Sequence, residues 1–290
     1  MPATPAAELP ALAFSAEDLI RLFDRAAPGY GCAALRFLPF AADRLVYRLG
    51  PRPGEKVLDV ATGTGTTALA VARLVQPSGR VTGIDVSEGM LERAEEEARR
   101  GGLGNADWHL MDARRLDFRS GYFHAVSCSA GLLYLPDPLE GLVEWRRVLR
   151  PGGRLLLTTF GAAAFEPMAG LLVARLKTAG PPLPERQPAF PWHRLGQPER
   201  CRQLLESAGL EDIALERLQV GFQLARADEW WEVIWHTELR GLVERLPESE
   251  QARLRLEHLE EVTALGTEDG IWMDVETWLV GGRRPIAGRE

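Results

Sequence analysis

The stretch VLDVATGTG, from Val57 to Gly65, ends an apolar run with an acid and then a glycine-spaced turn. An acid at the carboxyl end of a buried strand, followed by glycines, is typical of a ligand-binding edge of a parallel sheet. Gly63 and Gly65 let the backbone approach a ligand without an intervening Cβ atom. The helix expected after them presents free N–H groups to a negatively charged part of that ligand.

Asp85 stands twenty residues beyond Gly65, at the end of a second apolar run. There its carboxylate can accept hydrogen bonds from both hydroxyls of a ribose, which predicts a nucleoside-containing ligand. Because GTGTTA (63–68) matches the dinucleotide pattern G-x-G-x-x-G/A, an NAD(P)-dependent oxidoreductase and a non-catalytic nucleotide-binding module are both open interpretations. Asp59 favours a different ligand, since a carboxylate before the glycines would repel a pyrophosphate and suit a cationic amine.

Strand and helix signals alternate between residues 51 and 160. This alternation predicts a doubly wound α/β fold, in which helices cover both faces of a mostly parallel sheet. A helix is expected at 66–75, directly after the glycine turn, and Ser87 is expected to cap the acidic helix that ends at Gly101. The strands are expected at 56–60, 80–86, 107–113, 123–130 and 154–160.

The segments on either side of this core have different patterns. An Ala- and Pro-rich tail is followed by two expected helices, 15–31 and 33–49. After residue 160 a proline-dense insertion breaks the alternation, and further helices are expected at 198–208, 228–246 and 248–265. We therefore divide the chain into a tail with lid helices, a ligand-binding core, and a cap insertion with late helices and C-terminal strands, at residues 1–50, 51–160 and 161–290.

The composition limits the partners and the location. The 290 residues carry a formal net charge of −7 and have a sequence pI near 5.5, so a nucleic-acid-binding face is not expected. Cys32, Cys128 and Cys201 are far apart, which indicates neither a disulfide framework nor a CxxC metal site. No apolar run approaches the roughly 18 residues of a membrane span, and the N-terminus lacks a signal-peptide pattern. We expect a cytoplasmic protein without a bound metal.

Five ordered motifs between about residues 20 and 160 resemble those of class I S-adenosylmethionine-dependent methyltransferases, in particular the ubiquinone and menaquinone C-methyltransferase branch. The motifs are VLDVATGTG, VTGIDVSEGMLERA, MDARRLDF, FHAVSCSAGLLYLPD and EWRRVLRPGGRLLLTTF. The usual DxGxGxG is DxAxGxG here, with Ala61 at the first glycine. The resemblance implies S-adenosyl-L-methionine as methyl donor, S-adenosyl-L-homocysteine as product, and a seven-stranded sheet completed by an antiparallel hairpin. We expect that hairpin at 213–224 and 271–281, interrupted by helices within 228–265.

The resemblance also implies which residues hold the methyl donor. Asp59 and the glycine turn would hold its methionine end, and Asp85 would bind the ribose hydroxyls. Asp112 would take the adenine amino group, and Ser129 would line the pocket near the sulfonium. The full implied set is Asp59, Ala61, Gly63, Thr64, Gly65, Asp85, Val86, Met90, Asp112, Ala113 and Ser129.

The sequence predicts the chemical class of the methyl acceptor but not its identity. Since the sulfonium already carries a good leaving group, catalysis needs in-line positioning and, for some acceptors, a base. We expect a small molecule of quinone-precursor, phenolic, amine or natural-product type, bound between the N-terminal helices and the 161–197 insertion. Tyr30 is expected to cover the donor, and His193, beside Trp192, is the favoured acceptor-side base ahead of His236. Which atom is methylated, and the oligomeric state, stay open.

The remaining histidines and the late aromatic residues are expected to be structural. His109 lies mid-strand and is expected in the core, whereas His124 begins a strand and is expected at the surface. Trp230, Trp231 and Trp235 have helical spacing and are expected to be helix core.

Overall fold

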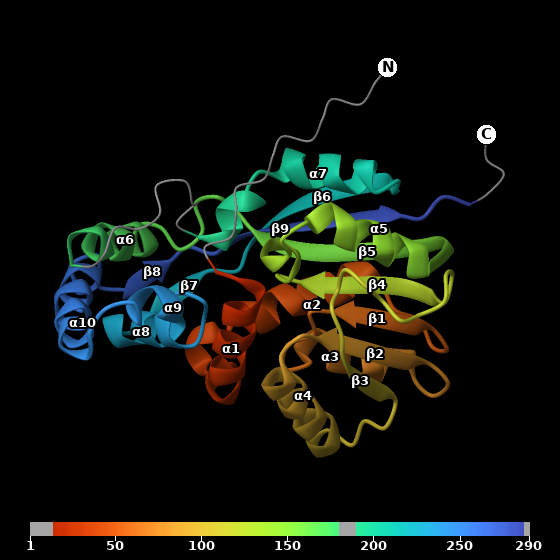
Figure 1. Cartoon of the computed structure of the whole chain (residues 1–290), viewed down its shortest axis with the longest axis horizontal. Coiled ribbons are helices and arrows are strands. Elements are labelled where there is room, and N and C mark those ends of the chain that lie inside the picture. Colours follow the sequence, from red (N-terminus) through yellow and green to blue (C-terminus); the bar gives the residue numbers. More distant parts are fainter. Residues whose placement is uncertain (1–13, 180–189, 287–290) are drawn as a thin grey trace.

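The computed structural model describes residues 14–179 and 190–286 (Figure 1). Seven strands form its main sheet: β1 (Lys56–Val60), β2 (Arg80–Asp85), β3 (Ala106–Leu110), β4 (Phe123–Ser129), β5 (Leu149–Phe160), β6 (Glu211–Gln219) and β9 (Glu276–Arg283). Their order across the sheet is β3-β2-β1-β4-β5-β9-β6. The first five strands are parallel, and β9 is antiparallel to both of its neighbours. The predicted seven-stranded, mostly parallel sheet is therefore confirmed.

The late extended stretches each divide between two sheets. Residues 213–224 give most of β6 and a short strand β7 (Phe222–Leu224), whereas 271–281 give β8 (Ile271–Met273) and most of β9. β7 and β8 pair as a separate two-stranded sheet. Gly221 lies at the break, where a Cβ atom would lie 2.4 Å from the carbonyl oxygen of Met273. Only glycine therefore permits the close crossing of the two chains at this bend.

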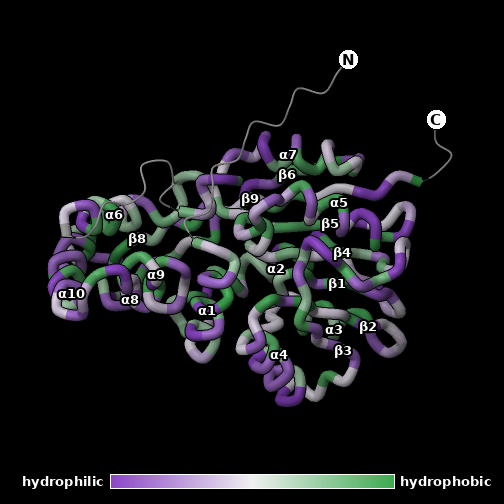
Figure 2. Tube along the Cα trace, in the orientation of Figure 1, coloured by the Kyte–Doolittle hydropathy of each residue, from purple (hydrophilic) through white to green (hydrophobic). Residues whose placement is uncertain are grey.

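Helices cover both faces of the main sheet. They are α2 (Phe37–Leu49), α3 (Thr66–Val75), α4 (Glu88–Arg100), α5 (Pro138–Val148) and α7 (Pro198–Ser207). The chain passes from β1 to β2 in one direction across the sheet and from β4 to β5 in the other. Because such crossovers are right-handed, α3 and α5 lie on opposite faces. The course of α4 is largely hydrophilic (Figure 2), in keeping with its acidic sequence.

The remaining helices gather at one end of the molecule, at the left in Figure 1. They are α6 (Met168–Ala179), α8 (Ala227–Trp235), α9 (Arg240–Val243) and α10 (Glu248–Thr263), which lie beside β7 and β8. Helix α1 (Ala16–Ala26) lies between this group and α4. We call α6, α8, α9, α10 and the β7–β8 pair the cap. Within residues 14–179 and 190–286, no helix combines the length and the apolar character that crossing a membrane requires.

Two sequence predictions about position need correction. β3 ends at Leu110 rather than at residue 113, so Asp112 and Ala113 follow the strand. His109 was expected in the core but is exposed, because β3 is the outermost strand of the sheet. The prediction for Trp230 and Trp231 is confirmed: both are buried in α8, and the Trp230 indole N–H donates to His258 Nε2 at 2.8 Å. Residues 1–13 and 180–189, with most of the predicted tail and proline-dense stretch, lie outside the described residues.

Candidate active site

The glycine turn after β1 is held against the end of β2. The Thr62 N–H donates to the carbonyl of Ile84 at 2.9 Å, and the Gly63 N–H donates to Asp85 Oδ2 at 2.8 Å. Gly65 has a φ of +82°, and a Cβ atom there would lie 2.9 Å from the Trp108 ring. Glycine is needed at this position for both reasons, and it sets the direction in which α3 begins.

Ala61 departs from the family's glycine, and the structure gives the consequence. Its φ is +51°, a left-handed conformation that strains any residue with a Cβ atom. A Cβ atom added to Gly131 would lie 2.4 Å from the Cβ of Ala61. The glycine in the loop after β4 therefore makes room for the methyl group that the first motif carries.

Asp59 is buried at the carboxyl end of β1, facing the glycine turn. Its carboxylate accepts hydrogen bonds from Thr62 Oγ1 and Ser127 Oγ, both at 2.6 Å. Burial raises the pKa of this carboxyl to about 6, although the two hydroxyl groups lower it. A cation placed beside Asp59 would favour the charged form of the carboxylate.

Asp85 links the glycine turn to the start of α4. It accepts the Gly63 N–H at 2.8 Å and the Ser87 N–H at 3.0 Å, and burial raises its pKa. Ser87 in turn caps α4, as predicted, and donates to Asp24 of α1 at 2.6 Å. Helix α1 is therefore attached to the sheet edge next to Asp85.

A cavity of about 180 Å³ brings together eight of the residues implied by the resemblance. Helix α1 closes it with apolar side chains that include Leu19, Ile20 and Phe23. The shape and lining suit a nucleoside that enters between α1 and the carboxyl edge of the sheet. The implied residues in its wall are Ala61, Gly63, Asp85, Val86, Met90, Asp112, Ala113 and Ser129. We call this space the nucleoside cavity.

The other implied residues lie at one side of the nucleoside cavity. Asp59 and Thr64 line a larger groove of about 480 Å³, which also contains Ala61, Gly63 and Ser129 in its wall. Gly65 lines neither space, and its contribution is the conformation of the turn.

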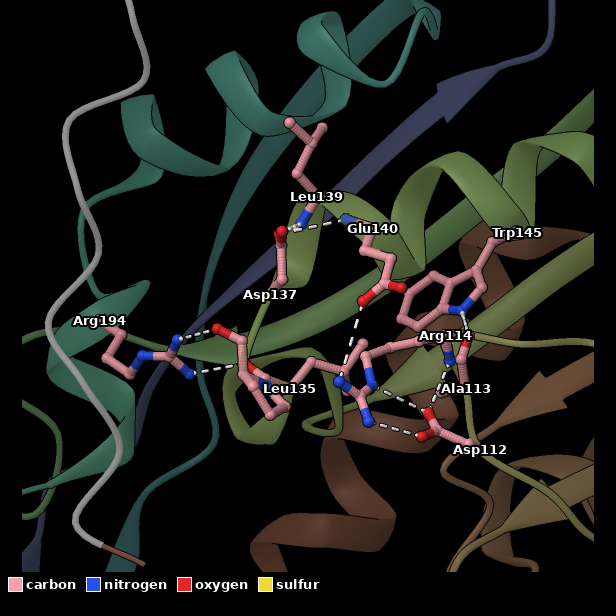
Figure 3. Close-up of polar contacts among 10 residues, drawn as sticks. Asp112, Ala113, Arg114, Leu135, Asp137, Leu139, Glu140, Trp145 and Arg194 are labelled. Carbon is pink, nitrogen blue, oxygen red and sulfur yellow. Dashed lines mark hydrogen bonds and ion pairs between the residues drawn. The ribbon is translucent and has the colours of Figure 1, made fainter. Parts of the chain in front are cut away.

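Asp112 is held by an arginine that the sequence analysis missed (Figure 3). Arg114 donates to Asp112 Oδ1 from Nε at 3.1 Å and to Oδ2 at 2.7 Å. The guanidinium lowers the pKa of the Asp112 carboxyl. Next to it, the Trp145 indole N–H donates to the Ala113 carbonyl at 2.8 Å. These contacts fix the strand-end loop after β3 at the far end of the nucleoside cavity.

Arg194 supports the loop after β4 from the other side of Figure 3. The residue is 1% exposed, and its guanidinium donates to the carbonyls of Leu133 and Leu135, both at 2.8 Å, and of Pro136 at 3.0 Å. Leu135 and Pro136 line the nucleoside cavity. Arg194 thus shapes this cavity without lining it.

Tyr30 lies where the spaces of the site meet. It lines the nucleoside cavity, the larger groove and a third cavity of about 30 Å³. A Cβ atom on Gly63 would lie 3.9 Å from its ring, and Phe23 meets the rings of Tyr30 and Tyr134 edge-on. The third cavity, called here the aromatic cavity, is lined by Tyr30, Phe37, Tyr134, Phe160, Phe165 and Trp192, and also by Glu238.

The sequence around the glycine turn is shared with known methyltransferases. Residues 57–153, from β1 through the glycine turn to the first part of β5, match the family model described as "Methyltransferase domain". The demethylmenaquinone methyltransferase of Beutenbergia cavernae is 39% identical over 171 residues, 57% of this chain and 68% of that enzyme. The chain belongs to the class I S-adenosylmethionine-dependent methyltransferases.

The matched lengths differ between relatives of this methyltransferase. It is 29% identical to the nocamycin O-methyltransferase of Saccharothrix syringae over 279 residues, 92% of this chain and 99% of that enzyme. By contrast, it spans about half the length of the ubiquinone/menaquinone C-methyltransferases, 48% in that of Cronobacter sakazakii. The solved structure of the [4+2]-cyclase SpnF shares the fold, with a TM-score of 0.65 at 22% identity over 97% of this chain and all of that one.

The acceptor-side residues predicted for the methyltransferase are not all brought to the cavities. The His193 ring packs edge-on against Phe190 and Trp192, and its pKa is lowered by burial. Trp192 is the member of that segment that lines the aromatic cavity. His236 covers Gly29, where a Cβ atom would lie 2.1 Å from its ring. Neither histidine is among the residues that line the three spaces described above.

Sequence reasoning missed Glu238, which lies between α8 and α9. Its side chain is buried, with 5% of the residue exposed, and it lines the aromatic cavity of the methyltransferase. The local sequence WHTEL contains no motif that marks this acid as different from its many neighbours. Its position follows from the packing of the cap against the sheet, which a single local pattern does not encode.

Proposed function

We propose that this methyltransferase transfers the methyl group of S-adenosylmethionine to an oxygen atom of a small, mostly apolar natural-product intermediate. The similarity to an O-methyltransferase over 92% of the chain carries this proposal. The ubiquinone/menaquinone C-methyltransferase of Cronobacter sakazakii matches a smaller share of the chain, 41%. The aromatic cavity supports an apolar acceptor, because six of its lining residues carry aromatic rings.

The acidic side chains of the site suit the polar groups of S-adenosylmethionine. We assign Asp59 to the cationic amine, Asp85 to the ribose hydroxyls and Asp112 to the adenine amino group. Met90 is buried beside the nucleoside cavity and Val86 is partly exposed there, so both can pack on the adenine. S-adenosylmethionine supplies an activated methyl group on a sulfonium, and the protein's contribution is to orient the two reactants and exclude water. Tyr30 lines all three spaces, and we assign it to the exclusion of water.

We expect Asp59→Asn to make the ligand-free protein more stable and the donor complex weaker. The pKa of about 6 in the folded protein exceeds the 3.8 of an unperturbed aspartate, so the folded protein holds the proton more tightly than the unfolded chain. Stability from this group is therefore lost as pH rises from about 4 to 6, and at neutral pH the asparagine variant should gain roughly 1–3 kcal/mol. Affinity for S-adenosylhomocysteine should fall at least tenfold, by roughly 1.5–3 kcal/mol.

Urea denaturation and calorimetry at pH 7.5 check both parts of this expectation. Ser127→Ala is a useful comparison, because it removes one hydrogen bond to Asp59 and keeps the charge. An Asp59→Asn variant that is less stable than the wild type and binds S-adenosylhomocysteine equally well would contradict the assignment.

The proposed function is tested by a screen for S-adenosylhomocysteine release. Phenols, enols, hydroxylated quinones, amines and active-methylene compounds are incubated with S-adenosylmethionine and the protein. We expect release with oxygen acceptors that carry an apolar ring system. Turnover confined to amines or to carbon acceptors would show that the proposal is wrong.

We also propose that neither nucleic acid nor a membrane is a partner and that the protein works in the cytoplasm. The net charge of −7 supports the first point, since phosphate binding needs a basic face. Cys32, Cys128 and Cys201 are free thiols, as is usual in a reducing compartment.

A further inference from the structure

Glu238 is a buried acid that the donor site does not use. It is 5% exposed, and it lines the aromatic cavity together with Tyr134, whose hydroxyl group lowers the pKa of the Glu238 carboxyl. Burial raises the pKa of Glu238, and within the described part of the chain no basic side chain contributes to holding its charge. An acid buried without a cationic partner destabilises a fold. Such a residue in a cavity therefore indicates a role in function.

The aromatic cavity adjoins the place where the methyl group must be presented. It shares Tyr30, Ala130 and Tyr134 with the nucleoside cavity, and Tyr30 and Leu38 with the larger groove. Ala130 follows Ser129 directly at the end of β4. A group bound beside Glu238 is therefore next to the donor's reactive end as the resemblance places it.

The backbone around this cavity is strained. Ala130 has a φ of +54° and Phe165 a φ of +67°, and both line the aromatic cavity. A left-handed conformation is unfavourable for a residue with a Cβ atom, and such residues concentrate at functional sites. Because the cavity has a volume of about 30 Å³, only the reacting end of an acceptor, such as one hydroxyl group, fits beside Glu238.

We propose that Glu238 is a catalytic residue that accepts the proton of the acceptor's hydroxyl group, and that the acceptor is a phenol or an enol. This inference rests on the proposed oxygen methylation. Tyr134 and Tyr30 are positioning residues that hold the carboxylate and the hydroxyl in line with the methyl group. A phenol or enol suits a carboxylate base, since its proton is acidic enough to transfer as the new bond forms, whereas that of an aliphatic alcohol is not.

The step balances without another reactant. The hydroxyl proton passes to Glu238, and the freed oxygen lone pair forms the bond to the methyl carbon. The carbon–sulfur bond breaks, and its electron pair stays on sulfur. The products are the methyl ether, S-adenosylhomocysteine and protonated Glu238, which returns its proton to water after release.

The test compares Glu238→Gln with the wild type on two acceptors of different acidity. One is an ordinary phenol found in the release screen, and the other is its nitro-substituted analogue, assayed at a pH where that hydroxyl is already ionised. Glutamine keeps the shape and an acceptor oxygen for Tyr134 but takes up no proton. We expect turnover of the ordinary phenol to fall by about 10²–10⁴-fold and turnover of the ionised analogue by less than about tenfold.

Other measurements separate this role from a structural one. Affinity for S-adenosylhomocysteine should be unchanged in Glu238→Gln, and Glu238→Asp, which keeps a carboxylate, should recover part of the lost turnover. The matched control is Glu232→Gln, which changes an exposed acid on α8. Equal losses on both acceptors, no loss on either, or a loss in His193→Ala in place of Glu238→Gln would overturn the inference and leave oxygen methylation standing. A wild type that methylates no hydroxyl compound would overturn the proposed function itself.

Discussion

Replacing Asp85 by alanine is expected to weaken S-adenosylhomocysteine binding by roughly 1.5–3 kcal/mol, about tenfold to 150-fold. The carboxylate accepts the N–H groups of Gly63 and Ser87 and has lone pairs left for two ribose hydroxyls. Its loss therefore removes the ribose contacts and also loosens the glycine turn. Calorimetric titration of both proteins with S-adenosylhomocysteine measures the difference.

The same titration distinguishes a site for S-adenosylmethionine from a site for a nicotinamide dinucleotide. Asp117→Ala serves as the control, since it removes an exposed acid elsewhere within residues 51–160. NADH should give no heat of binding with the wild type, because Asp59 disfavours a pyrophosphate at the turn. Unchanged binding in Asp85→Ala would show that the ribose is held elsewhere.

Replacing Arg194 by methionine is expected to reduce the free energy of unfolding by about 3 kcal/mol or more. The variant leaves the carbonyls of Leu133, Leu135 and Pro136 without their buried donor, and each unsatisfied buried group costs about 1–3 kcal/mol. Methionine preserves most of the apolar volume, so the loss reports mainly on hydrogen bonds. Urea denaturation at constant pH measures it.

The Arg194→Met variant should also bind S-adenosylhomocysteine more weakly than the wild type does. Leu135 and Pro136 line the nucleoside cavity, and a loop that is no longer held would have to be ordered on binding. Arg202→Met, which changes a half-buried arginine of α7 that pairs with Glu199, is the control and should change neither quantity by much. If Arg194→Met were as stable as the control, the guanidinium would have no part in shaping the cavity.

The position of the proposed donor-binding residues at one edge of the sheet was predictable because the signals are local. The acid, the glycines and the strand-end Asp85 are close in the sequence, and parallel strands bring their carboxyl ends to one edge. Asp112 lines the nucleoside cavity even though its strand ends at Leu110, because the loop that follows the strand stays at the same edge of the sheet. His109 was misplaced because a strand's position in the sheet, central or outermost, is not a local property of its sequence.

The acceptor side was not predictable in the same way. Glu238 acquires its burial from the packing of α8 and α9 against residues such as Tyr30 and Tyr134, which are more than a hundred positions away. Arg194 stood in the segment FPWHRLG that drew attention to His193, but its contacts are carbonyls about sixty residues earlier. Trp192 and Leu195 near Arg194 were the available signal, and such apolar residues indicate burial without indicating a partner.

We propose above all that the methyl group of S-adenosylmethionine is transferred to a hydroxyl oxygen of the acceptor. The most direct measurement uses S-adenosylmethionine carrying a ¹³C-labelled methyl group, the wild-type protein and the best phenolic or enolic acceptor from the screen. Carbon NMR of the product identifies the atom to which the labelled methyl group is bonded. We predict a methyl ether formed in equal amount to S-adenosylhomocysteine, and a labelled methyl group bonded to carbon or nitrogen would contradict oxygen methylation.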